Sequence, residues 1–295
     1  MTIGFVGLGI MGLPMAAALL DAGHQVIGYN RSAARTDELV RRGGGTADSL
    51  AELGRRCDMV ITMLPDTPDV EAVALTPEGL LTTMRPGSLL IDMSTVHPDT
   101  ARRIAAAGRD RGVDTLDAPV SGGEQGAIDR VLSIMVGGEA AALDRALPYL
   151  RAMGRTVVHV GPAGAGQTVK AANQLIVAGN LAILAEALVL LDVAGLPLPT
   201  ALEVLGDGLA GSRVLSQKGA TMSDGAFTPG FRVALHHKDL GIALETARGH
   251  GVALPVGSVA AQEMASLVAM GAGALDHAAV ISLVRLLSGV DAGQR

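Results

Sequence analysis

The stretch Gly4-Phe-Val-Gly7-Leu-Gly9-Ile-Met-Gly12-Leu-Pro-Met-Ala decides the fold. It carries the pattern G-x-G-x-x-G at Gly7, Gly9 and Gly12, directly after the apolar residues 3–6 and at the start of a helical pattern. In that context the first glycine permits a tight turn, the second lets the backbone approach a pyrophosphate, and the third lets helix and strand pack closely. The alternative is a glycine-rich turn without a ligand. We expect a dinucleotide-binding turn that consists of Gly7, Leu8, Gly9, Ile10, Met11 and Gly12.

Short apolar runs alternate with helical patterns through the first half of the chain. We expect strands over residues 3–6, 25–29, 59–64, 89–93, 115–117, 133–136 and 157–160, and helices over residues 11–22, 49–55, 100–111 and 140–153. This alternation predicts an α/β Rossmann-type, doubly wound and mainly parallel sheet with helices on both faces.

The strand signal stops at Gly164. We expect helices over residues 168–194, 199–206, 213–223, 234–249, 256–270 and 277–287. The sequence therefore predicts a Rossmann domain over residues 1–163 and an all-α C-terminal domain over residues 164–295, joined by a long interdomain helix. Residues 175–196 are apolar enough to resemble a membrane span, but they include Glu186 and Asp192. Because acidic residues are costly inside a bilayer, we expect a helix that is buried in protein.

The composition excludes some classes of partner and compartment. The chain has 295 residues, 2% aromatic residues and a net charge of -6, without the basic stripe or stacking aromatics of a nucleic-acid-binding protein. Glycines interrupt the apolar N-terminus and no basic segment precedes it, unlike a signal peptide. Cys57 is the single cysteine, which fits a reducing compartment, and we expect a cytoplasmic protein.

The ends of three predicted strands are candidates for cofactor contacts. After the second strand come Asn30, Arg31 and Ser32 instead of the acidic residue typical of an NAD site. They carry no charge that would repel a 2′-phosphate, and Arg31 can attract one, so we expect NADP(H) to be preferred, with NAD(H) possible. The alternative is that Arg31 only covers the adenine. Two further strand ends offer Leu64, Pro65 and Thr95, which can flank the cofactor or bind its nicotinamide half.

Two further segments are candidates for the chemistry. Lys170 follows three glycines at the start of a helical pattern, and Asn173 lies on the same helix face. Burial and the positive end of the helix both favour loss of the lysine proton, so Lys170 can be a general acid and base; a solvated surface lysine is the alternative. Ser121, Gly122 and Gly123 offer a hydroxyl and backbone N–H groups that suit a carboxylate. Together these features suggest reduction of a small carbonyl acid.

The chain resembles the β-hydroxyacid dehydrogenase family over essentially its whole length. Four blocks carry the resemblance: GFVGLGIMGLPMA at 4–16, DAPVSGGEQGA at 117–127, GPAGAGQTVKAANQ at 161–174 and KDLGIALE at 238–245. The resemblance implies a Rossmann domain, a long interdomain helix and a homodimer or homotetramer built through the helical domain. It implies Lys170 as the catalytic acid and base, and Ser121, Gly122, Gly123 and Asn173 as substrate anchors. It places Thr95 and Lys238 near the cofactor, and Phe231 and Asp239 at the closure of the pocket.

Within the family, residues 128–138, 208–215 and 227–240 are most similar to tartronate semialdehyde (2-hydroxy-3-oxopropionate) reductases. We expect that aldehyde to be reduced to D-glycerate. The alternatives are a 3-hydroxyisobutyrate dehydrogenase, a glyoxylate or succinic semialdehyde reductase, and a non-catalytic NADP(H) sensor. The chain departs from the subgroup's usual NADH preference at residues 29–32. We expect no metal, since the adjacent His236 and His237 cannot point at one ion from a helix.

Overall fold

The chain divides into two units, Met1–Lys170 and Ala171–Arg295. The computed structural model describes residues 1–290. The division falls at Lys170 rather than at the expected boundary of 163/164. The reason is that the first turn of helix α9 (Ala165–Val193) bonds to the sheet unit, since the backbone N–H groups of Gly164 and Gln167 donate to the Asp117 carboxylate.

The first unit is built on one sheet of nine strands in the order β3-β2-β1-β4-β5-β6-β8-β7, with β9 paired to β8. Pairs among β1 to β6 are parallel, β8 is antiparallel to both β6 and β7, and β9 is parallel to β8, so the expectation of a mainly parallel sheet is confirmed. The strands are β1 (Thr2–Val6), β2 (Gln25–Tyr29), β3 (Gly45–Thr46), β4 (Met59–Thr62), β5 (Leu89–Asp92), β6 (Asp114–Asp117), β7 (Val120–Ser121), β8 (Leu132–Gly138) and β9 (Gly154–Gly161). The sequence did not predict β3 and β7, because two residues carry no periodicity.

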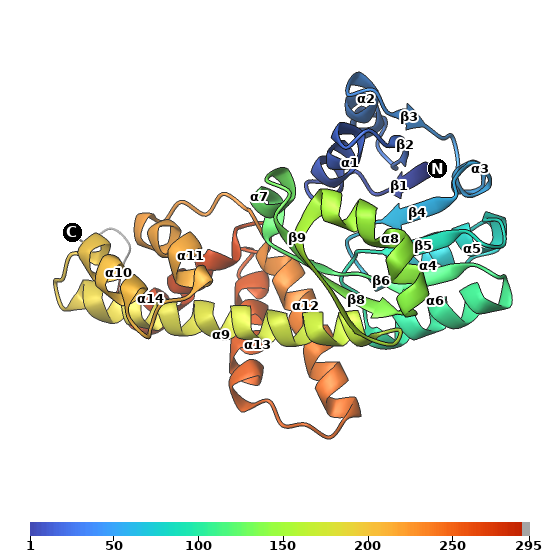
Figure 1. Ribbon diagram of the computed structural model, residues 1–295. Coiled ribbons are helices and arrows are strands. Elements are labelled where there is room, and N and C mark those ends of the chain that lie inside the picture. The colour runs from blue at the N-terminus through green and yellow to red at the C-terminus, as the bar shows by residue number, and fades with distance from the viewer. Residues whose placement is uncertain (291–295) are drawn as a thin grey trace. The chain divides into compact units, whose positions relative to one another are not determined.

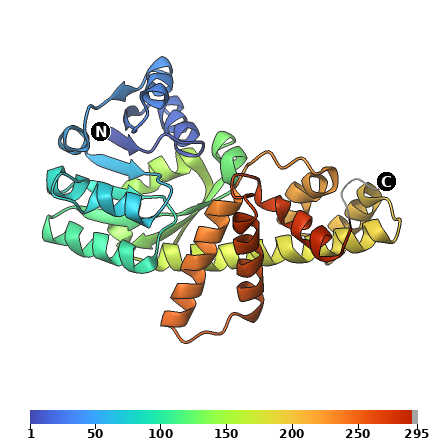
Figure 2. The ribbon, with the colours of Figure 1, turned by 180° about the vertical axis from the view of Figure 1, so that it is seen from behind.

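Helices cover both faces of this sheet, as Figures 1 and 2 show from opposite sides. Alternate strand residues separate two cores: Ile3 and Phe5 pack with α1 and α8, whereas Val6 and Val60 pack with α3, α4, α5 and α6. Cys57 belongs to the second core, and burial raises the pKa of its thiol to about 11. The helices are α1 (Gly12–Asp21), α2 (Ala33–Arg41), α3 (Leu50–Arg56), α4 (Thr67–Ala74), α5 (Leu80–Thr83), α6 (Pro98–Asp110), α7 (Gly123–Ile128) and α8 (Ala140–Met153).

The parallel register brings three polar side chains into one line at the carboxyl edge of the sheet. Thr62 is the register partner of Asp92, and Asp92 is the partner of Asp117. We call these three residues the carboxyl-edge row; all are buried. The segments that leave β4, β5 and β6 therefore start side by side, which is where ligands bind in open α/β sheets.

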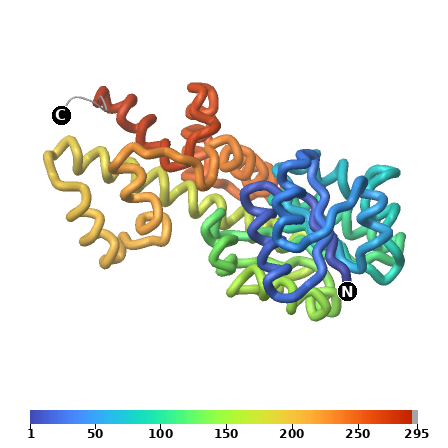
Figure 3. Tube along the Cα trace, turned by 90° about the horizontal axis from the view of Figure 1, so that it is seen from above, coloured from blue at the N-terminus to red at the C-terminus, as the bar shows by residue number. Residues whose placement is uncertain are grey.

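Within residues 171–290 the regular elements of the second unit are all helices, as expected, with one isolated β-bridge between Arg232 and Asp276. Figure 3 follows the turns between them along the trace. The core of this unit joins the second part of α9 to the helices that follow, with Leu181, Leu188, Val233, Met264 and Ile281 fully or almost fully buried. The elements are α10 (Leu198–Asp207), α11 (Arg213–Asp224), α12 (Val233–Gly249), α13 (Pro255–Ala269), the 3₁₀ turn η1 (His277–Ala279) and α14 (Val280–Leu287).

Helix α9 is buried on only one side, which corrects the expectation that protein surrounds it. By length and apolar composition it passes the test for a membrane span, with 33% of its most apolar window buried. Ile176, Ile183 and Leu190 are 66%, 61% and 70% exposed. Their spacing of seven residues places them on one face of the helix. The apolar composition thus serves a buried face and a separate exposed stripe.

Candidate active site

The turn between β1 and α1 requires glycine at two of the three positions of its G-x-G-x-x-G pattern. Gly7 has a φ of 93°, and a Cβ there would lie 2.3 Å from the Met63 carbonyl oxygen. A Cβ at Gly12 would lie 1.9 Å from the Gly7 carbonyl oxygen. At Gly9, by contrast, a Cβ would meet nothing within 4 Å. The turn therefore packs tightly against protein atoms at Gly7 and Gly12 and has open space at Gly9. That space fits a pyrophosphate that approaches the backbone at Gly9.

The segment after β2 is tied to this turn through Asn30. Its side-chain Oδ1 accepts a hydrogen bond from the Leu8 N–H at 3.0 Å, and its Nδ2 donates to the Ser32 carbonyl at 3.2 Å. Arg31 has 81% of its side chain exposed, and one guanidinium nitrogen lies 3.4 Å from an Asp69 carboxylate oxygen. Asn30 thus stabilises the turn through the Leu8 N–H, whereas Arg31 is exposed to solvent and forms only a surface ion pair.

A hydrogen bond joins the segment that follows β4 to the segment that follows β5. The Leu64 N–H donates to the Ser94 hydroxyl at 2.9 Å, next to the partly buried Thr95. Within the carboxyl-edge row, Asp92 Oδ1 accepts from the Thr62 hydroxyl at 2.7 Å and from the Ser94 N–H at 3.1 Å. Pro65 lies beyond these bonds and is exposed.

The segment after β6 carries Ser121, Gly122 and Gly123. Ser121 pairs with Ser133 across β7 and β8, and is partly exposed. Gly122 and Gly123 have φ values of 142° and 64°, a backbone that side chains other than glycine rarely adopt. Their N–H groups are consequently unshielded by side chains, as an anion-binding backbone requires.

Lys170 is the sixth residue of α9 and is buried, with 7% of its surface exposed. The helix begins three residues earlier than the expected residue 168, so the lysine lies about one and a half turns inside it. The field of a helix end falls off within its first turn, so the lysine lies beyond the part of α9 where that field is strongest.

The second unit links four polar side chains in series: Asn173, Gln174, Asp239 and Lys238. The Asn173 amide donates to Gln174 Oε1 at 2.7 Å, and Gln174 Nε2 donates to Asp239 Oδ2 at 2.6 Å. Lys238 Nζ lies 2.9 Å from Asp239 Oδ1 as an ion pair, without hydrogen-bond geometry at that oxygen. Three of the sequence-predicted residues are thus linked through a fourth, Gln174, that the sequence did not single out.

Phe231 belongs to a separate aromatic group in the second unit. Its ring contacts His236 and His277 edge-on, and the Nδ1 atoms of the two histidines lie 3.1 Å apart. Burial, together with the neighbouring His236, lowers the pKa of His277 to about 3. His237 is exposed, so the two adjacent histidines diverge as expected. Within residues 1–290, no three His, Cys, Asp or Glu side chains converge as metal ligands would.

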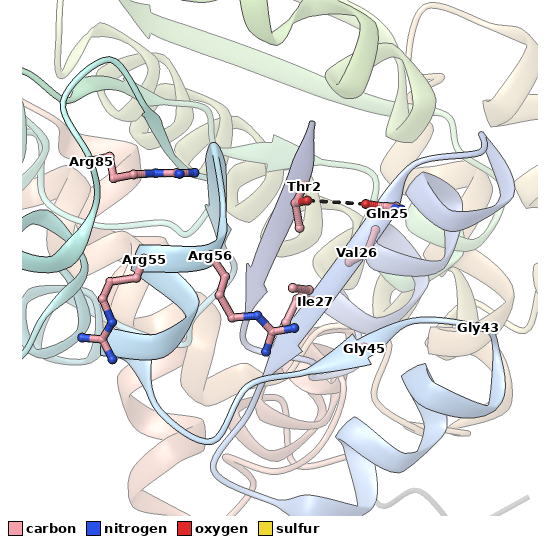
Figure 4. A pocket seen from close by; sticks show the side chains of 9 residues that line it. All are labelled: Thr2, Gln25, Val26, Ile27, Gly43, Gly45, Arg55, Arg56 and Arg85. Atoms are coloured by element: carbon pink, nitrogen blue, oxygen red, sulfur yellow. Dashed lines mark hydrogen bonds between the residues drawn. The ribbon is translucent and has the colours of Figure 1, made fainter.

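A surface hollow at the opposite edge of the sheet does not match the predicted site. It lies at the amino ends of β1 and β2, and Figure 4 shows Arg56 reaching across it. Arg56 is paired with Glu52 at 2.5 Å, and Arg85 with Asp58 at 2.9 Å. These carboxylates offset the charge that would attract an anion. The hollow is lined by Thr2, Gln25, Val26, Ile27, Gly43, Gly45, Arg55, Arg56 and Arg85.

Comparison with known families and proteins agrees with this arrangement. Residues 2–161 match the NAD-binding domain of 6-phosphogluconate dehydrogenase, and residues 164–284 match the NAD-binding domain of NADP-dependent 3-hydroxyisobutyrate dehydrogenase. The 2-hydroxy-3-oxopropionate reductase of Escherichia coli is 38% identical over 98% of both chains. The NAD-dependent L-serine dehydrogenase of Pseudomonas aeruginosa is 38% identical over 95% of this chain and 97% of its own.

A solved structure shares the whole fold. The 3-hydroxyisobutyrate dehydrogenase of Mycobacterium tuberculosis, solved with L-serine, is 36% identical, covers 96% of this chain and 99% of its own, and superposes with a TM-score of 0.88. The matches span both units and include the glycine-rich turn, the Ser-Gly-Gly segment and the Lys170 helix. The chain therefore belongs to the β-hydroxyacid dehydrogenases, the NAD(P)-dependent oxidoreductases that act on a CH–OH group.

Proposed function

We propose that this chain reduces a short aldehyde acid to its hydroxy acid with NADPH, and that tartronate semialdehyde, reduced to D-glycerate, is the substrate. The observation that carries the proposal is the burial of Lys170 on the turn of α9 that is bonded to the carboxyl edge of the sheet. A buried amine beside the expected nicotinamide site is suited to proton transfer.

The relatives support a three-carbon acid. One is named for 2-hydroxy-3-oxopropionate and another for L-serine, and the solved relative's structure is with L-serine. Each of these molecules has a carboxylate, a substituted carbon 2 and an oxygen on carbon 3. The shared skeleton favours a pocket that binds the carboxylate at one end and reacts at carbon 3.

In the proposed mechanism the site residues bind the substrate, transfer the proton or orient the reacting groups. The Ser121 hydroxyl and the N–H groups of Gly122 and Gly123 hold the substrate carboxylate. The nicotinamide, when bound, supplies the hydride for the aldehyde carbon. Lys170 Nζ donates a proton to the carbonyl oxygen during reduction and accepts the hydroxyl proton in the reverse direction. Asn173, whose amide is held by Gln174, orients the substrate or the lysine from the next turn of α9.

A panel of aldehyde acids tests the substrate. Tartronate semialdehyde, methylmalonate semialdehyde, succinate semialdehyde and glyoxylate are compared by kcat/KM with NADPH. We expect tartronate semialdehyde to rank first. A higher kcat/KM for methylmalonate semialdehyde would assign the chain to the 3-hydroxyisobutyrate dehydrogenases. Absence of turnover with every member, in a protein that binds NADPH, would favour the non-catalytic sensor.

Arg31 supports the proposed preference for NADPH over NADH. Its guanidinium is exposed after β2, and the surface ion pair with Asp69 holds it only weakly. We expect Arg31→Ala to raise KM for NADPH much more than KM for NADH. Arg41→Ala, which removes an exposed arginine at the other end of α2, is the matched control. Equal effects on both cofactors, or a wild-type preference for NADH, would refute the proposed preference.

We also propose a homodimer or homotetramer that assembles through residues 164–295. The exposed stripe of Ile176, Ile183 and Leu190 on α9 supports it, because apolar patches of this kind are commonly covered by another subunit.

A further inference from the structure

The buried carboxylate of Asp117 holds the start of helix α9. It ends β6, is 4% exposed, and accepts hydrogen bonds from the Gly164 N–H at 2.8 Å and the Gln167 N–H at 3.0 Å. The first N–H groups of a helix lack partners within it, and a negative group is favourable there. Asp117 therefore caps α9 from a strand that lies almost fifty residues earlier in the chain.

The surroundings of this carboxylate leave no space for another side chain. A Cβ at Gly137 would lie 2.5 Å from Asp117 Oδ1, and a Cβ at Gly166 would lie 2.8 Å from Oδ2 and 2.4 Å from the Met135 carbonyl oxygen. Both glycines are thus required for the close approach of strand, helix and carboxylate. The fit makes the position of the first turn of α9 depend on Asp117.

Gln167 joins the same turn to the segment after β5. Its side chain is 1% exposed, donates to the Ser94 carbonyl at 2.9 Å and accepts from the Val96 N–H at 3.1 Å. Thr95 lies between these two partners. Lys170 follows Gln167 by three residues, which is about one helical turn. One side chain thereby couples the lysine-bearing turn to the threonine expected near the nicotinamide.

We propose that Asp117 and Gln167, here called the α9 anchor, are positioning residues that set the place of Lys170 relative to Thr95 during proton transfer. This inference rests on the proposed function of Lys170. The anchor does not touch substrate or exchange protons with it. It acts by preventing displacement of α9, because a shift of about 1 Å in a catalytic group can cost on the order of a hundredfold in rate.

Two substitutions test the anchor. Asp117→Asn keeps the shape but replaces one acceptor oxygen by an NH₂ that faces a backbone N–H donor. Gln167→Met keeps the length but loses both bonds to the Ser94–Val96 segment, and it serves if the first variant does not fold. We expect kcat to fall on the order of ten- to a hundredfold, with KM changing less, in either variant. The matched control is Asp114→Asn on the same strand, where the carboxylate forms an exposed ion pair with Arg145.

Two measurements besides turnover accompany these variants. In Asp117→Asn the dissociation constant for NADPH is expected to stay within about twofold of wild type, because the Gly7–Gly12 turn is elsewhere in the unit. No such limit applies to Gln167→Met, which also releases the segment that carries Thr95. Hydrogen exchange at the Gly164 and Gln167 amides is expected to quicken in Asp117→Asn, since both donate to that carboxylate. Unchanged exchange at these amides, or unchanged kcat in a folded variant, would overturn the inference.

A double-mutant cycle separates positioning from general structural support. If Asp117 acts through Lys170, then Asp117→Asn causes no further loss, to within about twofold, in a Lys170→Ala background. Losses that multiply would show a structural role and overturn the inference. If Lys170→Ala alone keeps wild-type kcat, the proposed function fails instead. If that variant is inactive while both anchor variants are fully active, only the present inference fails.

The pH profile gives a further check. Burial raises the pKa of Asp117 to about 6, opposed by the bonds from Gly164 and Gln167 and assisted by Asp92 on β5. Of the charged side chains on the elements around Asp117, Arg102 on α6 lies 3.2 Å from the Cβ position of Gly164, and Lys170 follows Gln167 by three residues on α9. We expect kcat to fall below about pH 6 and this limb to vanish in Asp117→Asn. If kcat still fell below about pH 6 in Asp117→Asn, the result would contradict the proposed role of the α9 anchor.

Protonation of Asp117 does not by itself destabilise the fold in this pH range. The folded pKa of Asp117 lies above the ordinary value of 3.8, so the folded protein binds this proton more tightly than the unfolded chain does. The contribution of Asp117 to stability therefore rises as the pH falls from about 6 to about 4, while kcat is expected to fall.

Discussion

The two units position their predicted site residues by different means. In the first unit these residues occupy segments that follow parallel strands, and strand register places the segments side by side. In the second unit they occupy helices, and side-chain bonds through Gln174 link Asn173 to Asp239. A site built on strand ends can be recognised from short motifs, whereas a site built between helices depends on partners that are distant in sequence.

The largest expected effect is at Lys170, the last residue of the first unit. Lys170→Ala should lower kcat about 10²–10⁴-fold, because general acid–base help is lost, while NADPH still binds. Steady-state kinetics and NADPH titration measure the two quantities. Lys170→Arg should not restore turnover, since guanidinium does not release its proton in this pH range. An alanine variant with more than about a tenth of wild-type kcat would contradict the proposed role.

Ser121 tests the strand-end site directly. Ser121→Ala removes a hydrogen bond to the substrate carboxylate, worth roughly 1.5–3 kcal/mol, so kcat/KM should fall on the order of ten- to a hundredfold. Ser133→Ala removes the same hydroxyl from its register partner on β8 and should leave kcat/KM within about twofold. Equal losses in the two variants would mean that Ser121 supports the strand pair rather than the substrate.

Two glycines of the turn between β1 and α1, only two positions apart, are expected to affect different properties: Gly7 stability and Gly9 cofactor binding. Gly7→Ala should lower the free energy of unfolding by about 1–3 kcal/mol, because its φ is positive and its Cβ would meet the Met63 carbonyl. Gly9→Ala should change stability by less than about 0.5 kcal/mol, since the space there is open, but weaken NADPH binding. Urea denaturation measures the stability and NADPH titration measures the binding. If Gly9→Ala lowered stability and left NADPH binding unchanged, the result would contradict a cofactor at Gly9.

The smallest effect on chemistry, and the largest on assembly, is expected in the second unit. Ile183→Glu places a charge in the exposed stripe of α9 and should shift the protein towards monomer in light scattering at micromolar concentration. Val40→Glu makes a similar change on α2, where the side chain is 47% exposed, and should leave the mass unchanged. A wild-type protein that is already monomeric would contradict the proposed assembly.

The sequence by itself predicted the elements whose signals are local. The alternation of apolar runs located seven of the strands, and the glycine spacing located the turn whose φ and close contacts the structure displays. The helices of the second unit followed from apolar periodicity and from proline and glycine breaks. Two-residue strands such as β3 were missed because they have no period of their own.

Only the tertiary structure decided which side chains are partners. Asp117, Gln167 and Gln174 stood inside recognised motifs without an assigned role, because their partners lie on other elements. Helix α9 shows the same division: its composition predicted a buried apolar helix, whereas packing buried one face and left a stripe exposed. Helix and strand periods are properties of neighbouring residues, but burial and hydrogen-bond pairing depend on which elements the folded chain brings together.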